Sequence, residues 1–446
     1  MSPKAIILGI VIFFVALCAC ALGIVLLAGG LIAYQSGALA PPEPTLSPAE
    51  VETRIDEIEA FVIVNRGLQP AEPVELTFLT TQEVLDRTRA DFEEDTTPEE
   101  MADDALVLDA FGLMDADVDL YELLIRLYSE GVAGFFDPDT HEMVVVSDGG
   151  FNAYERAVFA HEYTHALQDQ VFGIRASGFS DEMWEADPER FNAIQAVLEG
   201  DASLLEEQFL DTYSLTERAQ YNREVNSVDV AIYFDLPAFL LQDFIFPYRE
   251  GLEFVRRYYD EGGWPAVDAL WTDPPVSTEH ILHPERYEAG DLPVIVARPA
   301  LTATLGSGWR LLDSNVNGEW YTYLLLAYGD DPAARLPDSR ARAAAEGWGG
   351  DGYVVHYHDA DAATVLAAEW VWDTVADADE FALAFGDYAN ARFGADTAMS
   401  SVAGTECWQT ASLTCLFHAS DRTLWLSTPD EATLTAVLEQ YPAFQP

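Results

Sequence analysis

The longest uninterrupted apolar run lies at the N-terminus of the chain. Residues 5–34 contain no charged side chain, a run longer than the roughly twenty residues that span a bilayer and longer than the apolar region of a cleaved signal peptide. This pattern predicts a single N-terminal transmembrane helix within residues 1–34. Because Lys4 precedes the run and acidic residues follow it, we expect a single-pass protein of the cell membrane whose bulk lies outside the cytoplasm.

Two other interpretations of this segment remain open. Ala38-Leu39-Ala40 has the small-x-small pattern of a signal peptidase site, and Leu17-Cys18-Ala19-Cys20 has the form of a lipoprotein signal, although the apolar run continues well past Cys20. Both alternatives also place the folded part of the chain outside the cytoplasm.

The rest of the chain divides by its pattern into a linker and two units. Residues 35–46 are rich in Pro, Ala, Ser and Gly and predict a linker. Residues 47–300 are dominated by helical periodicity, whereas residues 301–446 alternate short strands with helices. The sequence therefore predicts an α+β protein, in which a mostly helical domain with a small sheet precedes a C-terminal α+β module.

A β-hairpin is predicted in the middle of the first unit. Two β-rich runs, residues 131–136 and 143–146, flank the turn sequence Asp137-Pro138-Asp139-Thr140. An exposed strand there would suit the binding of an extended peptide, although an ordinary hairpin explains the pattern equally well. The two aspartates lack the full spacing of a calcium loop, so calcium at this turn is only a weak hypothesis.

Two buried helices follow the hairpin. The first is expected from about Ala153 to Phe172, with Asn152 as its N-cap and Gly173 after its end. Apolar residues occupy most of its circumference, which is typical of a core helix. A second helix is expected over residues 188–210.

The C-terminal module is expected to contain an antiparallel sheet. Cys407 and Cys415 flank Thr410-Ala411-Ser412 symmetrically, so a three-residue hairpin turn would place them opposite each other and allow a disulfide in an oxidising compartment. The predicted strands are Tyr353–Tyr357, Thr364–Trp372, Val402–Trp408, Leu413–Ala419 and Thr423–Ser427, and the predicted helices are Trp320–Tyr328, Asp338–Glu346, Ala378–Phe393 and Asp430–Tyr441.

The charge balance excludes some partners. The formal net charge is −55, and such an acidic surface repels nucleic acid and anionic lipid headgroups. A solvated surface that keeps the protein soluble explains this acidity, and so does attraction of cationic substrates or calcium. Neither explanation identifies a reaction, and the sequence does not indicate an oligomeric state.

The candidate chemistry lies in the first buried helix, which carries His161-Glu162-Tyr163-Thr164-His165. Histidines four residues apart project from one face of a helix and can bind one metal ion, with the glutamate beside them. Zinc suits this donor set because it takes imidazole and carboxylate ligands and leaves one position for water. Alternatively, the three side chains are ordinary polar groups of a packed interior, but burying them without a common partner is costly.

A third ligand is expected from the second helix. Glu199 is the carboxylate flanked by the buried positions of that helix, and Gly200 beside it would allow close backbone approach near a metal. Asp201, Glu206 and Glu207 are competing candidates that are otherwise expected to be solvated acids.

An H-E-x-x-H helix followed by a glutamate on a later helix resembles the gluzincin class of zinc metallopeptidases. The resemblance covers residues 120–290 and implies a zincin-like catalytic domain, with His161, His165 and Glu199 as Zn²⁺ ligands and Glu162 as general base. It thereby implies a zinc-dependent peptidase acting on a peptide or protein substrate. The interval to Glu199 is longer than in thermolysin-like enzymes, and Ser203 stands where those enzymes often carry an aspartate.

A non-catalytic binding or scaffold protein, with a structural metal site or none, is the alternative function. The intact Glu162 argues against it, because a structural site has no need of a base.

Three further predictions concern the surroundings of the site. By analogy with the thermolysin-like histidine, His283 would stabilise the oxyanion, although a loop histidine with a local hydrogen bond is an equal alternative. Asp169 would orient His165, or is a plain surface acid. The segment Trp348–Tyr353 would line the cleft, or is a structural turn.

Overall fold

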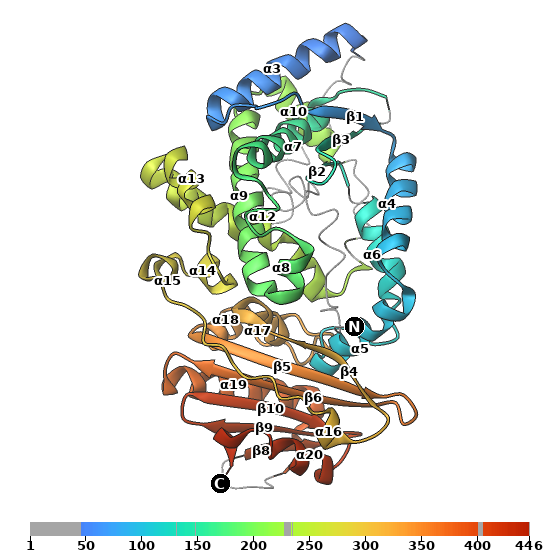
Figure 1. The fold of residues 1–446 in the computed structure, drawn as a ribbon, viewed down its shortest axis with the longest axis vertical. Coiled ribbons are helices and arrows are strands. Elements are labelled where there is room, and N and C mark those ends of the chain that lie inside the picture. The colour runs from blue at the N-terminus through green and yellow to red at the C-terminus, as the bar shows by residue number, and fades with distance from the viewer. Residues whose placement is uncertain are drawn as a thin grey trace.

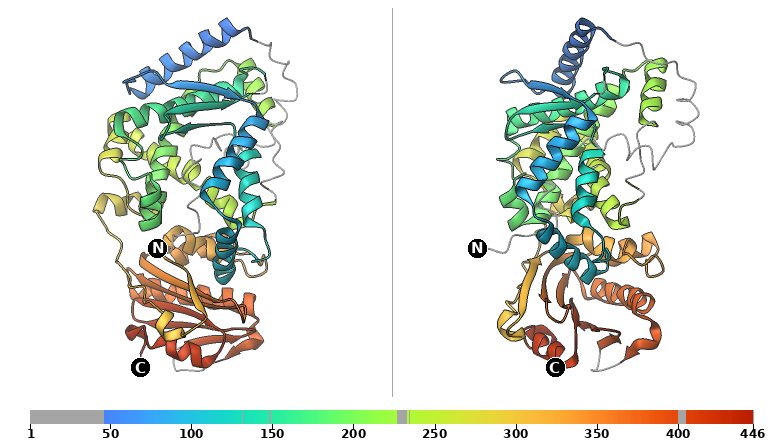
Figure 2. Two further views of the ribbon diagram at one scale, coloured as in Figure 1. Left: turned by 45° about the vertical axis from the view of Figure 1, so that its right-hand side comes forward. Right: turned by 90° about the vertical axis from the view of Figure 1, so that its right-hand side faces the viewer.

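The computed structural model describes residues 46–130, 132–147, 149–226, 233, 235–399 and 405–445 (Figure 1). It contains helices and two separate sheets, which confirms the predicted α+β class. A mostly helical unit with a small sheet lies above a module built on a larger sheet, and Figure 2 shows the same two layers from two further directions.

The predicted single N-terminal transmembrane helix is corrected. Residues 5–34, the cleavage and lipoprotein patterns and most of the linker lie outside the described residues. Within the described part of the chain, no helix is long and apolar enough to cross a bilayer. Even α12 (Ala238–Gly262), which has 25 residues, carries acids and arginines along its length. The fold of the described residues is therefore α+β without a membrane-spanning helix.

The small sheet contains the predicted hairpin. Strands β2 (Gly134–Asp137) and β3 (Glu142–Val146) pair antiparallel, which confirms the hairpin. Strand β1 (Glu75–Leu79), which the sequence pattern did not reveal, pairs parallel with β3, so that the order is β1-β3-β2. The strand β2 therefore lies at one edge of this sheet, next to the helix that carries His161 and His165.

In the described part of the chain, helices surround this small sheet. Both predicted helices are confirmed as α7 (Ala153–Phe172) and α9 (Pro188–Leu210). They cross the centre of the unit and are buried along most of their length. The other helices of this unit are α3 (Pro48–Arg66), α4 (Thr81–Asp95), α5 (Pro98–Phe111), α6 (Leu120–Glu130), α8 (Asp181–Ala186), α10 (Leu215–Val225), α12, α13 (Trp264–Thr272), α14 (Thr278–Leu282) and α15 (Pro284–Ala289).

The C-terminal module is built on a seven-stranded antiparallel sheet. Cys407 and Cys415 pair directly across two adjacent strands and form the predicted disulfide. In sheet order, the strands are β4 (Trp309–Asn315), β5 (Trp348–His358), β6 (Ala363–Trp372), β10 (Arg422–Thr428), β9 (Leu413–Ala419), β8 (Thr405–Gln409) and β7 (Ala398–Met399). The helices are α16 (Thr302–Leu305), α17 (Gly318–Ala327), α18 (Asp338–Ala345), α19 (Val375–Phe393) and α20 (Glu431–Leu438).

The glycine-rich segment at Trp348–Tyr353 belongs to a strand and is not a free turn. It begins β5, where the register shifts between Trp348 and Gly350. A side chain at Gly350 would lie 2.2 Å from the carbonyl oxygen of Val294, and φ is 151° there. Glycine is needed because the chain before the module packs directly over this strand.

The two units share one hydrophobic core. Phe111 at the end of α5 packs edge-on against Tyr353 of β5, with 5.0 Å between ring centroids, and against Trp425 of β10 at 5.8 Å. A single buried cluster runs from Ile58 in α3 to Trp425. This continuity fixes α9 relative to the module and so gives the site a rigid frame.

Candidate metal centre

The motif helix begins where its sequence predicts. The side-chain oxygen of Asn152 accepts hydrogen bonds from the backbone N–H groups of Tyr154 and Glu155, at 2.9 and 3.0 Å. The Glu155 carboxylate in turn accepts from the N–H of Asn152, completing a capping box. From this fixed start, the side chains of His161 and His165 project from one face, one turn apart.

The second helix is brought close by paired glycines. A side chain at Gly200 would lie 2.3 Å from the carbonyl oxygen of Gly251 in α12, and one at Gly251 would lie 2.2 Å from that of Ala196. Gly200 therefore allows a close backbone approach beside Glu199, and the backbone that approaches is that of α12. By fixing α9 against α12, the crossing holds the neighbouring Glu199 in place.

Three side chains from these helices converge on one point. The Nε2 atoms of His161 and His165 lie 3.0 Å apart, and Oε2 of Glu199 lies 3.2 and 3.4 Å from them, respectively. Ligand bonds of about 2.0 to 2.1 Å in a tetrahedral zinc site place neighbouring ligand atoms about 3.3 Å apart. The spacing of the three atoms therefore fits one metal ion at their centre.

The outer nitrogens of both imidazoles have acceptors. Nδ1 of His165 lies 2.7 Å from Oε1 of Gln168, whose amide nitrogen donates to the carbonyl oxygen of Leu198 at 3.2 Å. Nδ1 of His161 lies 3.3 Å from Oε2 of Glu206. Both contacts favour the tautomer in which Nδ1 carries the proton, so each Nε2 presents a lone pair to the centre.

Two imidazole lone pairs and a carboxylate repel one another unless a cation lies between them. All three side chains are fully buried, so water does not screen this repulsion. The donor set thus fits a divalent metal such as zinc, and its chemistry alone leaves the choice of metal open.

Glu162 lies beside this group on the side of the small sheet. The side chain is fully buried, and its Cγ is 3.4 Å from the position that a side chain at Gly134 would take. Gly134 is the first residue of the edge strand β2. The ring of Tyr248 in α12 packs with Ala133 and Val158 near the same strand and lies 6.4 Å from the imidazole ring of His161.

The competing acids of α9 are committed to other contacts. Both carboxylate oxygens of Asp201 accept hydrogen bonds from the buried guanidinium of Arg66, at 2.6 and 2.8 Å. Glu207 pairs with Arg256 at the surface. Glu206 is buried and contacts His161, so the expectation of a solvated acid is wrong for Asp201 and Glu206.

His283 belongs to a different cluster. Its Nε2 lies 2.8 Å from Oε1 of Glu319, and this hydrogen bond raises the pKa of His283 while burial lowers it. The adjacent helix α14 is held by Glu189, whose carboxylate accepts from Thr278 at 2.9 Å. Glu189 lies ten residues before Glu199 on α9, which corresponds to about 15 Å along the helix axis. We refer to His161, His165 and Glu199 as the metal group. The described contacts therefore do not join His283 to the metal group.

Asp169 does not contact His165. Its carboxylate binds Nδ1 of His141 at 2.9 Å and the backbone N–H of Ile174 at 3.0 Å, near the end of α7. Gln168, the preceding residue, takes the role that was predicted for Asp169. Sequence reasoning missed Gln168 and considered Glu206 only as a competing ligand, although Glu206 lies seven residues after Glu199 and hence two turns along the same face of α9.

The calcium hypothesis at the hairpin turn gains no support. Asp137 accepts hydrogen bonds from the backbone N–H groups of Asp139 and Thr140 and from the Thr140 hydroxyl. Asp139 pairs with Arg175. These contacts account for both acids as the partners of an ordinary turn.

Comparison with known proteins adds one match. Residues 309–438 match a family model described as a domain of unknown function, DUF8575. The match begins at the first residue of β4 and ends at the last residue of α20, so it covers the sheet of the C-terminal module and leaves the metal group outside. No curated protein and no solved structure matches the chain.

Proposed function

We propose that this chain is a zinc-dependent peptidase, in which His161, His165 and Glu199 bind the metal and Glu162 is the general base. The observation that carries the proposal is the convergence of two imidazole lone pairs and one carboxylate, 3.0 to 3.4 Å apart, beside a further buried glutamate. A structural zinc site normally has four protein ligands. Three ligands with a carboxylate beside them are typical of a catalytic site.

The residues of the chain would act as follows. Bound zinc would lower the pKa of a coordinated water and polarise a peptide carbonyl. Glu162 would accept the proton of the attacking water and pass it to the leaving amine. We propose Tyr248, whose ring lies 6.4 Å from that of His161, as the donor that stabilises the oxyanion, because His283 contacts Glu319 in a separate cluster.

The small sheet supports a peptide as the substrate. Strand β2 pairs with β3 on one side only among the described strands, and its first residue lies against Glu162. An extended peptide paired with this edge would run past the metal group. Because the residues of β2 and the metal group are buried, the surrounding side chains must move before a peptide can enter.

That burial favours a second candidate function. In this conformation, the side chains of His161, Glu162, His165 and Glu199 have no exposed surface. A metal held there would also serve as a structural bridge between α7 and α9 in a non-catalytic binding or scaffold protein. The two functions differ in whether Glu162 is needed.

Substitution of Glu162 decides between them. We expect the purified chain to bind one zinc ion and to cleave a reduced, alkylated protein, and Glu162→Gln to keep zinc while losing cleavage by at least about a hundredfold. Glu207→Gln, on the surface of α9, is the matched control and should cleave normally. Zinc content is measured by atomic emission and cleavage by release of labelled peptides. Zinc binding with equal cleavage by Glu162→Gln would show that Glu162 is not the base.

We also propose an extracytoplasmic location for the folded part. The disulfide between Cys407 and Cys415 supports it, because such bonds persist in oxidising compartments. Thiol labelling of the protein in intact cells and after lysis tests this proposal. Two free thiols at these positions in the native protein would contradict it.

A further inference from the structure

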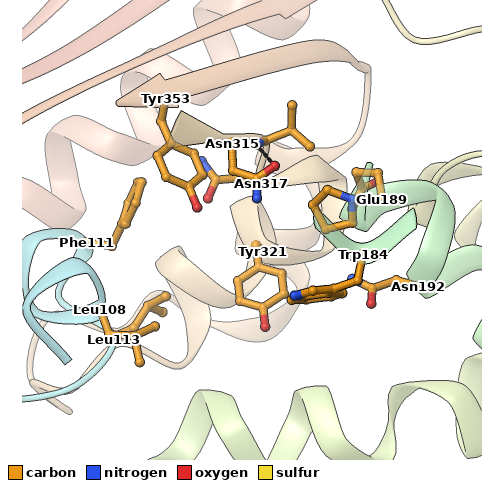
Figure 3. Close-up of a pocket in the computed structure, with 12 residues that line it drawn as sticks. Leu108, Phe111, Leu113, Trp184, Glu189, Asn192, Asn315, Asn317, Tyr321 and Tyr353 are labelled. Carbon is orange, nitrogen blue, oxygen red and sulfur yellow. Dashed lines mark hydrogen bonds between the residues drawn. The ribbon is translucent and has the colours of Figure 1, made fainter. Parts of the chain in front are cut away.

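A cavity separate from the candidate metal centre lies where the helical unit meets the C-terminal module. Its empty volume is about 470 Å³, counting the part open to solvent. Figure 3 shows its walls, which come from both units: Phe111 from α5, Trp184 from α8, Asn192 from α9, and Tyr321 and Tyr353 from the module. Mostly aromatic and aliphatic walls with a few polar groups, at a junction between units, are typical of ligand-binding cavities.

The cavity wall contains an unused hydrogen-bond donor. The side chain of Trp184 is 4% exposed, and its indole Nε1 has no hydrogen-bond partner among the described residues. The ring packs edge-on against Phe191 at 5.3 Å, which fixes its plane. Leaving a buried donor without an acceptor destabilises the protein. An acceptor on a molecule in the cavity would remove that destabilisation.

The surroundings disfavour an anion as the occupant. The hydroxyl of Tyr321 donates to Asp243 at 2.7 Å, and that of Tyr353 donates to Asp313 at 2.6 Å, so carboxyl groups stand directly behind the wall. Glu189 itself lines the cavity. A negatively charged ligand would be repelled by the carboxylates of Asp243 and Asp313.

A cation is also disfavoured. Oε2 of Glu189 already accepts from the N–H and the hydroxyl of Thr278, both at 2.9 Å, and burial raises the pKa of this carboxyl well above its ordinary value. The unused polar groups of the wall are donors, the indole Nε1 of Trp184 and the amide Nδ2 of Asn317, which a cation cannot satisfy. An uncharged acceptor such as a carbonyl, joined to an apolar group, meets both conditions.

The cavity lies on the same face of α9 as the metal group. Asn192 and Glu199 are seven residues apart, which is two turns of helix and about 10 Å along the axis. An extended peptide advances about 3.3 Å per residue. A peptide with its scissile bond at the metal would thus reach the cavity with a residue about three positions away.

We propose that this cavity takes an uncharged apolar side chain of the peptide substrate and that the indole of Trp184 donates to a neighbouring peptide carbonyl. The proposal rests on the peptidase function proposed above and defines its substrate class. Preferred peptides carry an aromatic or large aliphatic residue about three positions from the bond that is cleaved.

Binding of a small neutral amide tests this cavity directly. The full chain has 10 tryptophans, so it is labelled with 5-fluorotryptophan, and the resonance of Trp184 is assigned with Trp184→Phe. Titration with N-acetylphenylalaninamide should shift that resonance saturably. Phenylalaninamide, which is cationic, and N-acetylphenylalanine, which is anionic, should each bind at least about tenfold more weakly. Absence of a saturable shift, or equal binding of a charged analogue, overturns the proposal.

Two variants and a kinetic measurement complete the test. Trp184→Phe removes the donor and should weaken amide binding, and Leu113→Phe should narrow the cavity and weaken it as well; both must melt cooperatively. The binding measurement needs neither zinc nor cleavage, so its failure is distinct from failure of the peptidase proposal. In the active protein, Trp184→Phe should raise KM for peptides with the apolar residue more than it lowers kcat. An unchanged KM overturns the substrate role of the cavity.

Discussion

The side-chain oxygen Oε1 of Gln168 lies 2.7 Å from Nδ1 of His165, within the same helix. The amide nitrogen of Gln168 donates to the carbonyl oxygen of Leu198, next to Glu199. One glutamine therefore orients a proposed metal ligand on α7 and is itself held by the helix that supplies another. Because the contact leaves Nε2 of His165 unprotonated, it prepares the imidazole to bind a metal.

Loss of this contact should weaken metal binding without unfolding the protein. We expect Gln168→Ala to lower zinc affinity about 10- to 100-fold, the usual effect of removing the partner of a metal-bound histidine. Competition with a chromogenic zinc chelator measures the affinity. Gln82→Ala, at an exposed position in α4, is the control and should bind zinc like the unaltered protein. Equal affinities of the two variants would show that Gln168 does not orient His165.

Removal of the metal should destabilise the native state. A ligand present at a hundred times its Kd stabilises a protein by about 2.7 kcal/mol, and here the metal would also relieve repulsion among three buried donors. We therefore expect a chelator to lower the melting temperature of the full chain. His161→Ala should melt at the same temperature with or without the chelator. If the chelator leaves the unaltered protein unchanged, the three donors do not hold a metal.

Local signals explain why the core of the site could be predicted. The capping box at Asn152 and the spacing of His161 and His165 act within a few residues, so the sequence determines the helix and the shared face. Glu199 followed from its place among buried positions on α9. These features depend on helix geometry, which tertiary packing did not alter.

The parts that could not be predicted depend on long-range contacts. His283 pairs with Glu319, 36 residues later in the chain, and Asp201 pairs with Arg66, 135 residues earlier. Strand β1 pairs in parallel with a strand more than sixty residues away, without a local turn to reveal it. The apolar run at the N-terminus suggested a membrane helix, which the described helices do not include. Periodicity cannot identify the partners of His283, Asp201 and β1, because these partners lie far away in the sequence.

Close contact between α9 and α12 makes Gly200 sensitive to substitution. An added methyl group at this residue would lie 2.3 Å from the carbonyl oxygen of Gly251, so the helices must separate. We expect Gly200→Ala to destabilise the protein by about 1 to 3 kcal/mol and to weaken zinc binding by moving Glu199. Gly150→Ala is the control, because the nearest atom there is 3.8 Å away. Urea unfolding and zinc competition measure the two effects, and a native-like Gly200→Ala would contradict this role of the crossing.

Glu279 in α14 should make stability depend on pH. Its side chain is buried, with 4% exposed. Burial and the nearby carboxylates of Glu319, Asp373 and Asp291 together raise its pKa to about 8, although Arg286 opposes them. The native state therefore keeps a proton that the unfolded chain, with an ordinary pKa of 4.5, releases. It follows that this residue lowers the free energy of unfolding as the pH rises from 4.5 to 8.

Replacement by the neutral amide isolates this effect. Below pH 4.5 the carboxyl is protonated in both states, so Glu279→Gln and the unaltered protein should differ little. Above pH 8, the variant should be more stable by an amount on the order of 5 kcal/mol, measured by urea unfolding at each pH. Glu285→Gln, at an exposed position in α15, should follow the unaltered protein throughout. A difference between Glu279→Gln and the unaltered protein that stays constant from pH 4.5 to 8 would mean that Glu279 ionises normally in the native state.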